Sequence, residues 1–371
     1  MVRPLFLADL WGGPRAVVSE PIFISIDAMG GDHGPSIVTA GVALALERLR
    51  DRRVGFLLHG DEAMLEAELA KFPTARAASQ VRPSSLVIGM QDKPAQAVRR
   101  GKGSSLWNAV EAIRKGEAQA VVSAGNTGAL MAISKLILRM ASAELDRPAI
   151  VASWPTMRGV TAVLDVGANV TSDAAQLVQF AIMGEAFYRA VHGSAKPTVG
   201  LLNVGSEEQK GHEEVKEAHR LLREGGLPID YRGFVEGDDI AKGTVDVVVT
   251  DGFSGNIALK TAEGVARFVR GLLRDSFTSS LRAKLGAVIA GPALKQVAAR
   301  LDPSSVNGGP LLGLKGIVVK SHGGADAKGF ANAIVVAANL ASSNYSEDID
   351  SNMRRLADAI GAMGGPAEKA T

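Results

Sequence analysis

Six short apolar runs, each ending abruptly in a glycine-rich polar turn, constrain the fold of this chain more than any other feature. The runs do not alternate apolar with polar residues, which is typical of buried parallel strands covered on both faces. Most of the turns are followed by a stretch with helical periodicity. The six segments are IFISIDAMGGDHG (22–34), AVVSAGNTG (120–128), TAVLDVGAN (161–169), TVGLLNVGSEEQKG (198–211), VDVVVTDGFSGN (245–256) and GIVVKSHGGADAKG (316–329).

Strand-like and helix-like segments alternate from residue 21 to about residue 270. This alternation predicts an α/β fold with a doubly wound, mostly parallel sheet. In an open parallel sheet the turns after the strands gather at one edge, where ligands bind. Because Asp, Asn, Ser, Lys and His accompany the glycines, we expect one crevice rich in amides and charges, suited to phosphate or another oxyanion.

The composition is that of a soluble globular protein, with 46% hydrophobic and 22% charged residues in a chain of 371. A net charge of +2 and the lack of any nucleic-acid-binding motif argue against a nucleic-acid partner. There is no cysteine, which excludes disulfides and thiolate nucleophiles and fits a reducing cytoplasm. No His, Asp or Glu spacing resembles a metal site.

Residues 1–20 lack the apolar core of roughly 7–15 residues that a signal peptide requires, so we interpret them as a loose extension. Residues 21–346 are predicted to form the α/β domain, and residues 347–371 a C-terminal helix and tail. The longest charge-free stretch, 329–346, contains asparagines and serines, which favours a buried helix over a membrane span.

Two segments depart from the βαβ rhythm. Residues 76–105 are polar and basic, which predicts either a mobile loop near the crevice or a solvated surface. In 271–301 apolar residues recur every four positions through Ile289, and Gly291 and Pro292 then interrupt the pattern. This spacing predicts a helical hairpin inserted before the last strand.

Two turns carry the densest chemistry. The first offers glycines for close backbone approach beside carboxylates and an imidazole, although Asp32 could instead cap the next helix. The last offers a lysine and a histidine at a strand end, a good anion receptor and acid–base group, although the histidine could be a buried structural residue. The candidates are Asp27, Gly30, Gly31, Asp32 and His33 in the first turn, and Lys320, Ser321, His322, Gly323 and Lys328 in the last.

Two further turns offer small donors and amides at strand ends. Their asparagines could equally be ordinary turn residues, and Lys260 lies one helical turn beyond Asn256. The candidates are Ser123, Gly125, Asn126 and Thr127, and Asp251, Gly252, Asn256 and Lys260. The charged residues of 203–211 could belong to a site or could equally be solvated surface residues. The G-x-S-x-G motif of serine hydrolases does not occur, which argues against that class of enzyme.

Seven longer motifs run in order through residues 22–344: DAMGGDHGP, KPAQAVRR, SAGNTGALMA, LDVGANV, GLLNVGSEEQKG, DGFSGNIALKTAEG and PLLGLKGIVVKSHGGADAKGFANAI. Together they closely resemble the bacterial phosphate acyltransferase family. Two departures are mild. Gly89 and Gln91 stand where acidic residues are expected, which weakens a role for the 85–92 loop. Thr171 and Ser172 replace a more usual Asp-Cys pair and leave no reactive thiol.

The resemblance implies a fold similar to phosphotransacetylases and isocitrate-dehydrogenase-like proteins, a central cleft and a homodimer. It implies conversion of acyl-[acyl-carrier-protein] and inorganic phosphate into acyl phosphate, without a cofactor. The product would pass to a membrane acyltransferase that acylates glycerol 3-phosphate in phospholipid synthesis.

Within that reaction, four residues are the catalytic candidates: His322, Lys320, Asn256 and Asp27. Lys320, His322 and the amides around Gly323 would bind phosphate or the oxyanion. Asp27 and Asp32 are expected to position basic groups, because carboxylates repel phosphate.

The resemblance also bears on partners and location. Basic residues such as Arg99, Arg100 or Lys102 would dock the acidic carrier protein. The inserted hairpin suits contact with the inner face of the membrane or with a dimer mate, so the protein is expected to be cytoplasmic and peripherally associated. The apolar contact candidates are Leu281, Leu285, Val288 and Ile289.

Three other functions compete with this one. A phosphotransacetylase would use coenzyme A thioesters instead of the carrier protein. An NAD-linked dehydrogenase is disfavoured because no dinucleotide fingerprint occurs. A non-catalytic scaffold that recruits carrier protein to the membrane would have an unreactive cleft. The charged residues at the strand ends disfavour a scaffold, because they would have no purpose in such a cleft.

Overall fold

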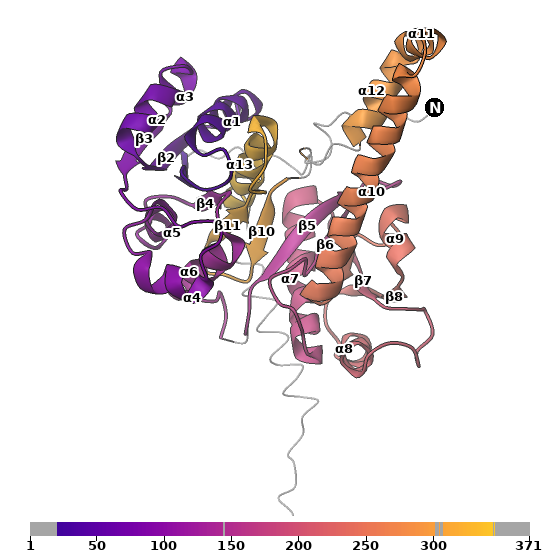
Figure 1. Ribbon diagram of the computed structural model, residues 1–371. Helices are drawn as coiled ribbons and strands as arrows, with labels where there is room; N and C mark the ends of the chain where they lie inside the picture. Colours follow the sequence, from indigo (N-terminus) through magenta and orange to yellow (C-terminus); the bar gives the residue numbers. More distant parts are fainter. Residues whose placement is uncertain (1–20, 144, 301–303, 305–306, 344, 346–371) are drawn as a thin grey trace, which may run out of the picture.

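The computed structural model describes residues 21–143, 145–300, 304, 307–343 and 345, so the expected extension 1–20 and tail 347–371 lie outside the described residues. Its strands form an 11-stranded sheet in the order β3-β2-β1-β4-β11-β10-β5-β6-β9-β7-β8 (Figure 1). The strands are β1 (Ile22–Asp27), β2 (Val54–Gly60), β3 (Ser79–Pro83), β4 (Ala120–Ser123), β5 (Ala149–Pro155), β6 (Val160–Leu164), β7 (Thr198–Leu202), β8 (Asp230–Val235), β9 (Val247–Val249), β10 (Gly309–Leu312) and β11 (Ile317–Lys320).

Helices pack on both faces of this sheet. One face carries α1 (Pro35–Arg48), α2 (Glu62–Leu69), α3 (Pro73–Ala77), α7 (Ala174–His192), α8 (Glu213–Glu224) and α13 (Ala327–Ala341). The other carries α4 (Pro94–Arg100), α5 (Ser105–Arg114), α6 (Thr127–Leu138), α9 (Gly237–Lys242) and the start of α10 (Gly252–Thr278). The predicted α/β class is confirmed, and all six apolar runs are strands.

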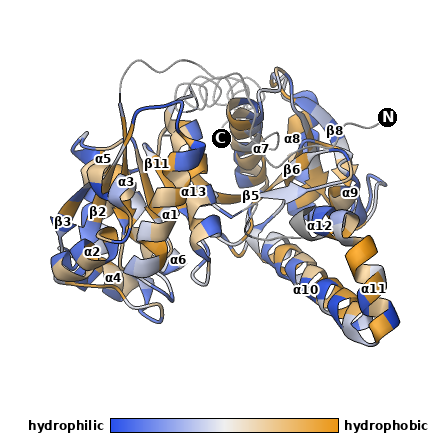
Figure 2. Cartoon of the chain, turned by 90° about the horizontal axis from the view of Figure 1, so that it is seen from above, coloured by the Kyte–Doolittle hydropathy of each residue, from blue (hydrophilic) through white to orange (hydrophobic). Residues whose placement is uncertain are grey.

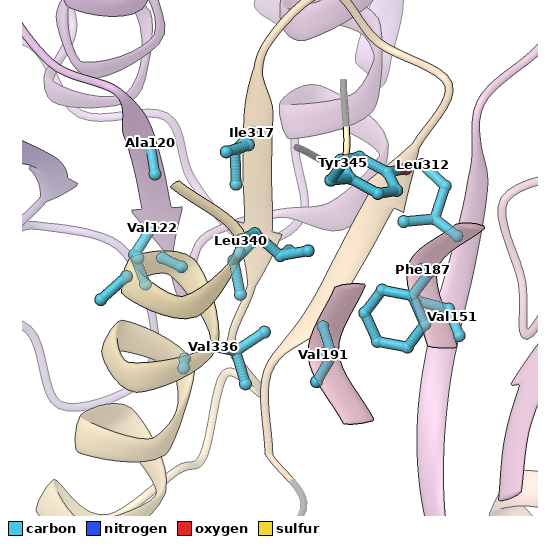
Figure 3. Packing of buried hydrophobic residues seen from close by; sticks show 14 of the residues in the cluster. Ala120, Val122, Val151, Phe187, Val191, Leu312, Ile317, Val336, Leu340 and Tyr345 are labelled. Carbon is cyan, nitrogen blue, oxygen red and sulfur yellow. The ribbon is translucent and has the colours of Figure 1, made fainter. Parts of the chain in front are cut away.

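The continuous valine runs are explained by this double cover. In β9, Val247 and Val249 belong to the core on one face, whereas Val248 between them belongs to the core on the other face. All three side chains are fully buried because each face of the strand meets a helix layer. Figure 3 shows how β4, β11, β10 and β5 pack against α13 and α7 in the first of these cores.

The sheet is not parallel throughout. Strands β3, β2, β1, β4 and β11 run parallel, but β10 is antiparallel to both β11 and β5, and β5 is antiparallel to β6. Strands β6, β9, β7 and β8 are again mutually parallel. The carboxyl ends of β6, β9 and β7 therefore point opposite to those of β1, β4 and β11 along the sheet. The expectation of one common edge for all six turns is wrong, since it assumed one strand direction.

The predicted hairpin is present, with different boundaries. Its first arm, α10, runs unbroken for 27 residues, about 40 Å, from Gly252. Ser279 and Ser280 end that arm, and α11 (Leu281–Ile289) begins where the Ser280 side chain caps it by accepting from the Ala283 amide. The fourfold spacing through Ile289 therefore spans two helices.

Helix α11 lies at the tip, away from the sheet, and the chain returns from it through α12 (Gly291–Arg300) (Figures 1 and 2). Within the described residues, no helix is long and apolar enough to cross a membrane.

Candidate active site

The turns after β1, β4 and β11 meet because these strands are parallel neighbours. The Asp32 amide donates to the carbonyl of Gly323 over 2.9 Å, and the Ser321 amide donates to the carbonyl of Ser123 over 2.9 Å. We call residues 27–34, 123–127 and 320–328 the Asp27 cluster. The structure thus brings together the candidates of the first, second and last glycine-rich turns.

Asp27 lies at the centre of this cluster and is only 2% exposed. The Ser123 hydroxyl donates to Asp27 Oδ2 over 2.8 Å and accepts from the Gly125 amide over 3.0 Å. Burial raises the pKa of Asp27, and the hydroxyls of Ser105 and Ser123 partly oppose that rise. Ser105, in the first turn of α5, was not a sequence candidate.

Gly30 is required by this packing. A Cβ atom at Gly30 would lie 2.5 Å from Asp27 Oδ2 and 2.7 Å from the Gly125 nitrogen, so no side chain fits there. Gly31 next to it has a φ of +93°, a conformation that favours glycine. The two glycines allow the first turn to touch the second and last turns directly.

Lys320 ends β11 with its amine largely removed from solvent. Its Nζ donates to the carbonyl of Ala124 over 3.2 Å and to the carbonyl of Ser321. Burial lowers the pKa of Lys320 to about 8, and the charges of Asp27 and Asp32 counteract that lowering. The carboxylates thus favour the protonated form of the amine.

His322 is exposed, not buried. Its Nδ1 accepts from the Gly324 amide over 3.1 Å, so the proton of the neutral ring lies on Nε2, which is left as a donor. Asn307 holds this turn: its Oδ1 accepts from the His322 amide over 2.9 Å, and its Nδ2 donates to the Ser321 hydroxyl over 2.8 Å. Sequence reasoning missed Asn307, although its Asn-Gly pair before β10 marks a turn.

Asp32 does not cap the following helix. Its carboxylate lies against Gly323 and Gly324, and the N-cap of α1 is Gly34, which has no side chain to accept from the first amides of the helix. A pocket opens beside this uncapped end. It is lined by residues of the Asp27 cluster, including His33, Gly34 and Gly323, and by the apolar side chains of Ile37, Val38 and Phe330.

Three helices begin at the Asp27 cluster, namely α1, α6 and α13. Thr127 is the first residue of α6, and Lys328 lies in the first turn of α13. Because helix N-termini carry a partial positive charge, these ends and Lys320 make the cluster receptive to an oxyanion.

Asn126 acts through its neighbours. Its Oδ1 caps α6 by accepting from the Ala129 amide, and its Nδ2 donates to the carbonyls of Met90 and Asp92 over 2.9 Å each and of Gly89 over 3.4 Å. The side chain therefore fixes the 89–92 loop beside the cluster. Segment 76–105, expected as a loop or solvated surface, contains β3 and α4.

The turns after β6 and β9 form a second group, the Asp165 cluster (165–169 and 250–256). The buried Asp165 carboxylate accepts from the amides of Ile150, Gly167, Ala168 and Asn169 and from the Asn169 side chain. Burial raises its pKa, and these donors oppose that rise. Asp165 thus organises the turn, a role that was not predicted for it.

The remaining candidates lie at this second cluster. Asp251 caps α10 through the Ser254 amide and hydroxyl, over 2.8 and 2.9 Å. The Gly252 amide donates to the carbonyl of Asn169 over 2.8 Å, and the Asn256 side chain lies against Gly167. Lys260 is exposed one helical turn further on.

In the 203–211 turn, Asn203 donates to the carbonyls of Gly205 and Lys210, and Glu207 pairs with Lys210 over 2.8 Å. These bonds explain the turn as local surface structure.

Comparison with known proteins places the chain. The family described as fatty acid synthesis protein matches residues 22–348. A phosphate acyltransferase from Caulobacter vibrioides is 69% identical over 346 residues, 93% of this chain and 95% of that protein. Another from Phenylobacterium zucineum is 60% identical over 354 residues, 95% of this chain and 100% of that protein.

Among solved structures, a phosphotransacetylase from Streptococcus pyogenes matches with a TM-score of 0.59 at 15% identity, over 88% of this chain and 95% of that one. The EutD phosphotransacetylase from Staphylococcus aureus gives a TM-score of 0.57 at 16% identity, over 90% and 97%.

The fold is that of the phosphotransacetylases, and with the relatives it defines an α/β acyltransferase. More narrowly, the chain belongs to the phosphate acyltransferase family of fatty acid and phospholipid synthesis.

Proposed function

We propose that the protein converts acyl-[acyl-carrier-protein] and inorganic phosphate into acyl phosphate and free carrier protein. The observation that carries this proposal is the convergence of three helix N-termini, one of them uncapped, with the partly buried amine of Lys320. Such a site favours a phosphate dianion and a developing oxyanion. The acyl phosphate would then serve acylation of glycerol 3-phosphate by a membrane acyltransferase.

Phosphate is the nucleophile in this mechanism. One phosphate oxygen attacks the thioester carbonyl, the tetrahedral oxyanion collapses, and the carbon–sulfur bond breaks to release the carrier thiolate, which takes up a proton. Lys320 and the amides near Gly323 would hold the phosphate, and orientation of the two reactants can contribute roughly 7–11 kcal/mol. The Nε2–H of His322 would donate to the oxyanion or to the leaving sulfur.

The Asp165 cluster would bind another part of the donor, with Asn256 and Lys260 facing it. Neighbouring strands twist by roughly 20–25°, so the five steps from β4 to β9 turn the strand axis by about 100–125°. The two sets of carboxyl ends belong to strands that run in opposite senses along the sheet, but with this twist their directions differ by only about 55–80°. This angle supports one substrate reaching both clusters across the middle of the sheet.

Helix α4 and its ends are proposed to dock the carrier protein. Lys93, Arg99, Arg100 and Lys102 are exposed, and none forms an ion pair with another described residue. Unpaired cations on one surface attract an acidic partner and speed its association. α4 also packs against α6, whose N-terminus belongs to the Asp27 cluster.

The tip of the hairpin is proposed to contact the membrane, and the apolar face of α10 a second copy in a homodimer. Leu281, Leu285, Val288 and Ile289 are all strongly exposed, Leu281 at 86%. Arg282 and Lys284 lie among them, as on an interfacial helix. The enzyme would therefore be cytoplasmic and peripherally bound.

The direct test is mass detection of acyl phosphate from palmitoyl-carrier protein and phosphate. The expected result is phosphate-dependent loss of the carrier thioester with matching acyl phosphate. Faster reaction with palmitoyl-coenzyme A would favour the phosphotransacetylase alternative, and no product from either donor would favour a scaffold.

A further inference from the structure

The 85–92 loop presents three apolar side chains to solvent beside the Asp27 cluster. Leu86, Val87 and Met90 are 49%, 52% and 41% exposed, whereas Ile88 between them is buried in the core. Met90 also reaches the site: a Cβ atom at Gly323 would lie 3.0 Å from Met90 Cε. An apolar surface thus extends outward from the turn that carries His322.

The loop is firmly held, so these side chains are exposed on an ordered backbone. The Ser105 amide donates to the carbonyl of Leu86 over 3.0 Å, and Asn126 binds three carbonyls of 89–92. The Asp92 carboxylate accepts from the Gly89 amide over 2.8 Å. Such a preorganised surface binds a ligand without a large ordering cost.

The neighbourhood indicates the occupant. The loop leads directly into Lys93 and α4, the surface of unpaired cations, and its other side contacts Gly323. An acyl-carrier-protein thioester has parts that match these surfaces. Its acidic protein would meet the cations of α4, its thioester would lie at the turn of Gly323, and its apolar chain would lie on the loop. Gly89 and Gln91 place no charge within the apolar surface.

We propose that Leu86, Val87 and Met90 form the surface that receives the acyl chain of the donor thioester, which makes them specificity-determining residues. This inference rests on the proposed function, because it names part of the substrate at the same site. It assigns the 85–92 loop a role in binding despite its missing acidic residues.

The test replaces the three side chains with serine, as Leu86→Ser, Val87→Ser and Met90→Ser together. Burying one methylene changes binding about fourfold. We therefore expect kcat/KM for palmitoyl-carrier protein to fall at least about tenfold, with less than about a twofold change for butyryl-carrier protein. The KM for phosphate should not change. Leu136→Ser and Met64→Ser, similarly exposed at 54% and 50%, are the matched controls.

Equal losses for both donors, no loss, or the same loss in the controls would overturn the proposal. A defect confined to vesicle binding or to self-association would also overturn it, in favour of a membrane or a second copy as the occupant. Calorimetric binding of a non-hydrolysable palmitoyl-pantetheine amide is measured alongside. This arm requires no catalysis, so weaker binding by the triple variant would support the surface even if the wild-type protein forms no acyl phosphate.

Discussion

The amine of Lys320 at the end of β11 donates over 3.2 Å to the carbonyl of Ala124, which follows the adjacent strand β4. This bond holds the amine at the junction of the turns, where burial lowers its pKa to about 8 from the usual 10.5. Lys320 is therefore charged at pH 7 and loses its proton within the range in which enzymes are assayed.

The first prediction concerns pH. Because phosphate binds the protonated amine, kcat/KM for phosphate should fall above pH 8, approaching tenfold per pH unit. Below about pH 7 the amine is mostly protonated, so kcat/KM calculated from the concentration of the phosphate dianion should be flat there. The measurement is a pH profile at subsaturating phosphate. Lys320→Arg should be slower but should lose the descending limb, since its guanidinium stays charged; an unchanged limb would assign the titration to another group.

The second prediction concerns His322, whose Nε2–H is the free donor. His322→Ala should lower kcat about a hundredfold or more, as expected for loss of an acid–base group or oxyanion donor. His322→Gln keeps an N–H donor and should recover part of the rate. Single-turnover formation of acyl phosphate is the measurement. Near-normal product from the alanine variant would remove His322 from the catalytic set.

The third prediction separates the two roles of Asn126. Asn126→Asp retains an acceptor for the α6 cap but loses three bonds to the loop and places a carboxylate beside carbonyl oxygens. Losing such bonds costs roughly 1–3 kcal/mol. Hydrogen exchange should therefore quicken in 89–92 while α6 stays protected. In Asn126→Ala both segments should exchange faster; equal protection in all three proteins would show that the loop is held by other contacts.

The fourth prediction compares two glycines. Gly30→Ala should disrupt the Asp27 cluster and abolish activity, because its Cβ would overlap Asp27 Oδ2 and the Gly125 nitrogen. Gly264→Ala in α10 meets no atom within 4 Å and should raise the free energy of unfolding by roughly 0.5–1 kcal/mol. Urea unfolding and activity assays check both, and a fully active Gly30→Ala enzyme would contradict the predicted overlap.

The fifth prediction concerns the hairpin tip. Leu285→Glu with Ile289→Glu should reduce co-sedimentation with anionic vesicles at least about tenfold, since two exposed apolar side chains would become charged. Met64→Glu is the control, because Met64 is also exposed but lies in α2, far from the hairpin in the sequence. If vesicle binding is unchanged but the oligomeric state shifts, the tip contacts a second copy instead.

The strands and the inserted hairpin could be predicted because their signals are local. A run such as Val247–Val249 is apolar at every position only if both of its faces are covered, and such runs marked six of the eleven strands in the described part of the chain. Hairpin boundaries were less accurate, because the apolar spacing continues across Ser279 and Ser280, where the helix ends.

The candidate site, too, was predictable only where its signals are local in the sequence. The sequence by itself determined which turns carry glycines, carboxylates, lysine and histidine, because short-range constraints on φ and close approach select those residues. Only the tertiary structure decided which turns meet, since the reversals at β10 and β5 separate the Asp27 and Asp165 clusters. It also decided that Asn126 and Asn307 hold loops and that Lys320 is partly buried, because burial and hydrogen-bond partners come from residues far apart in the chain.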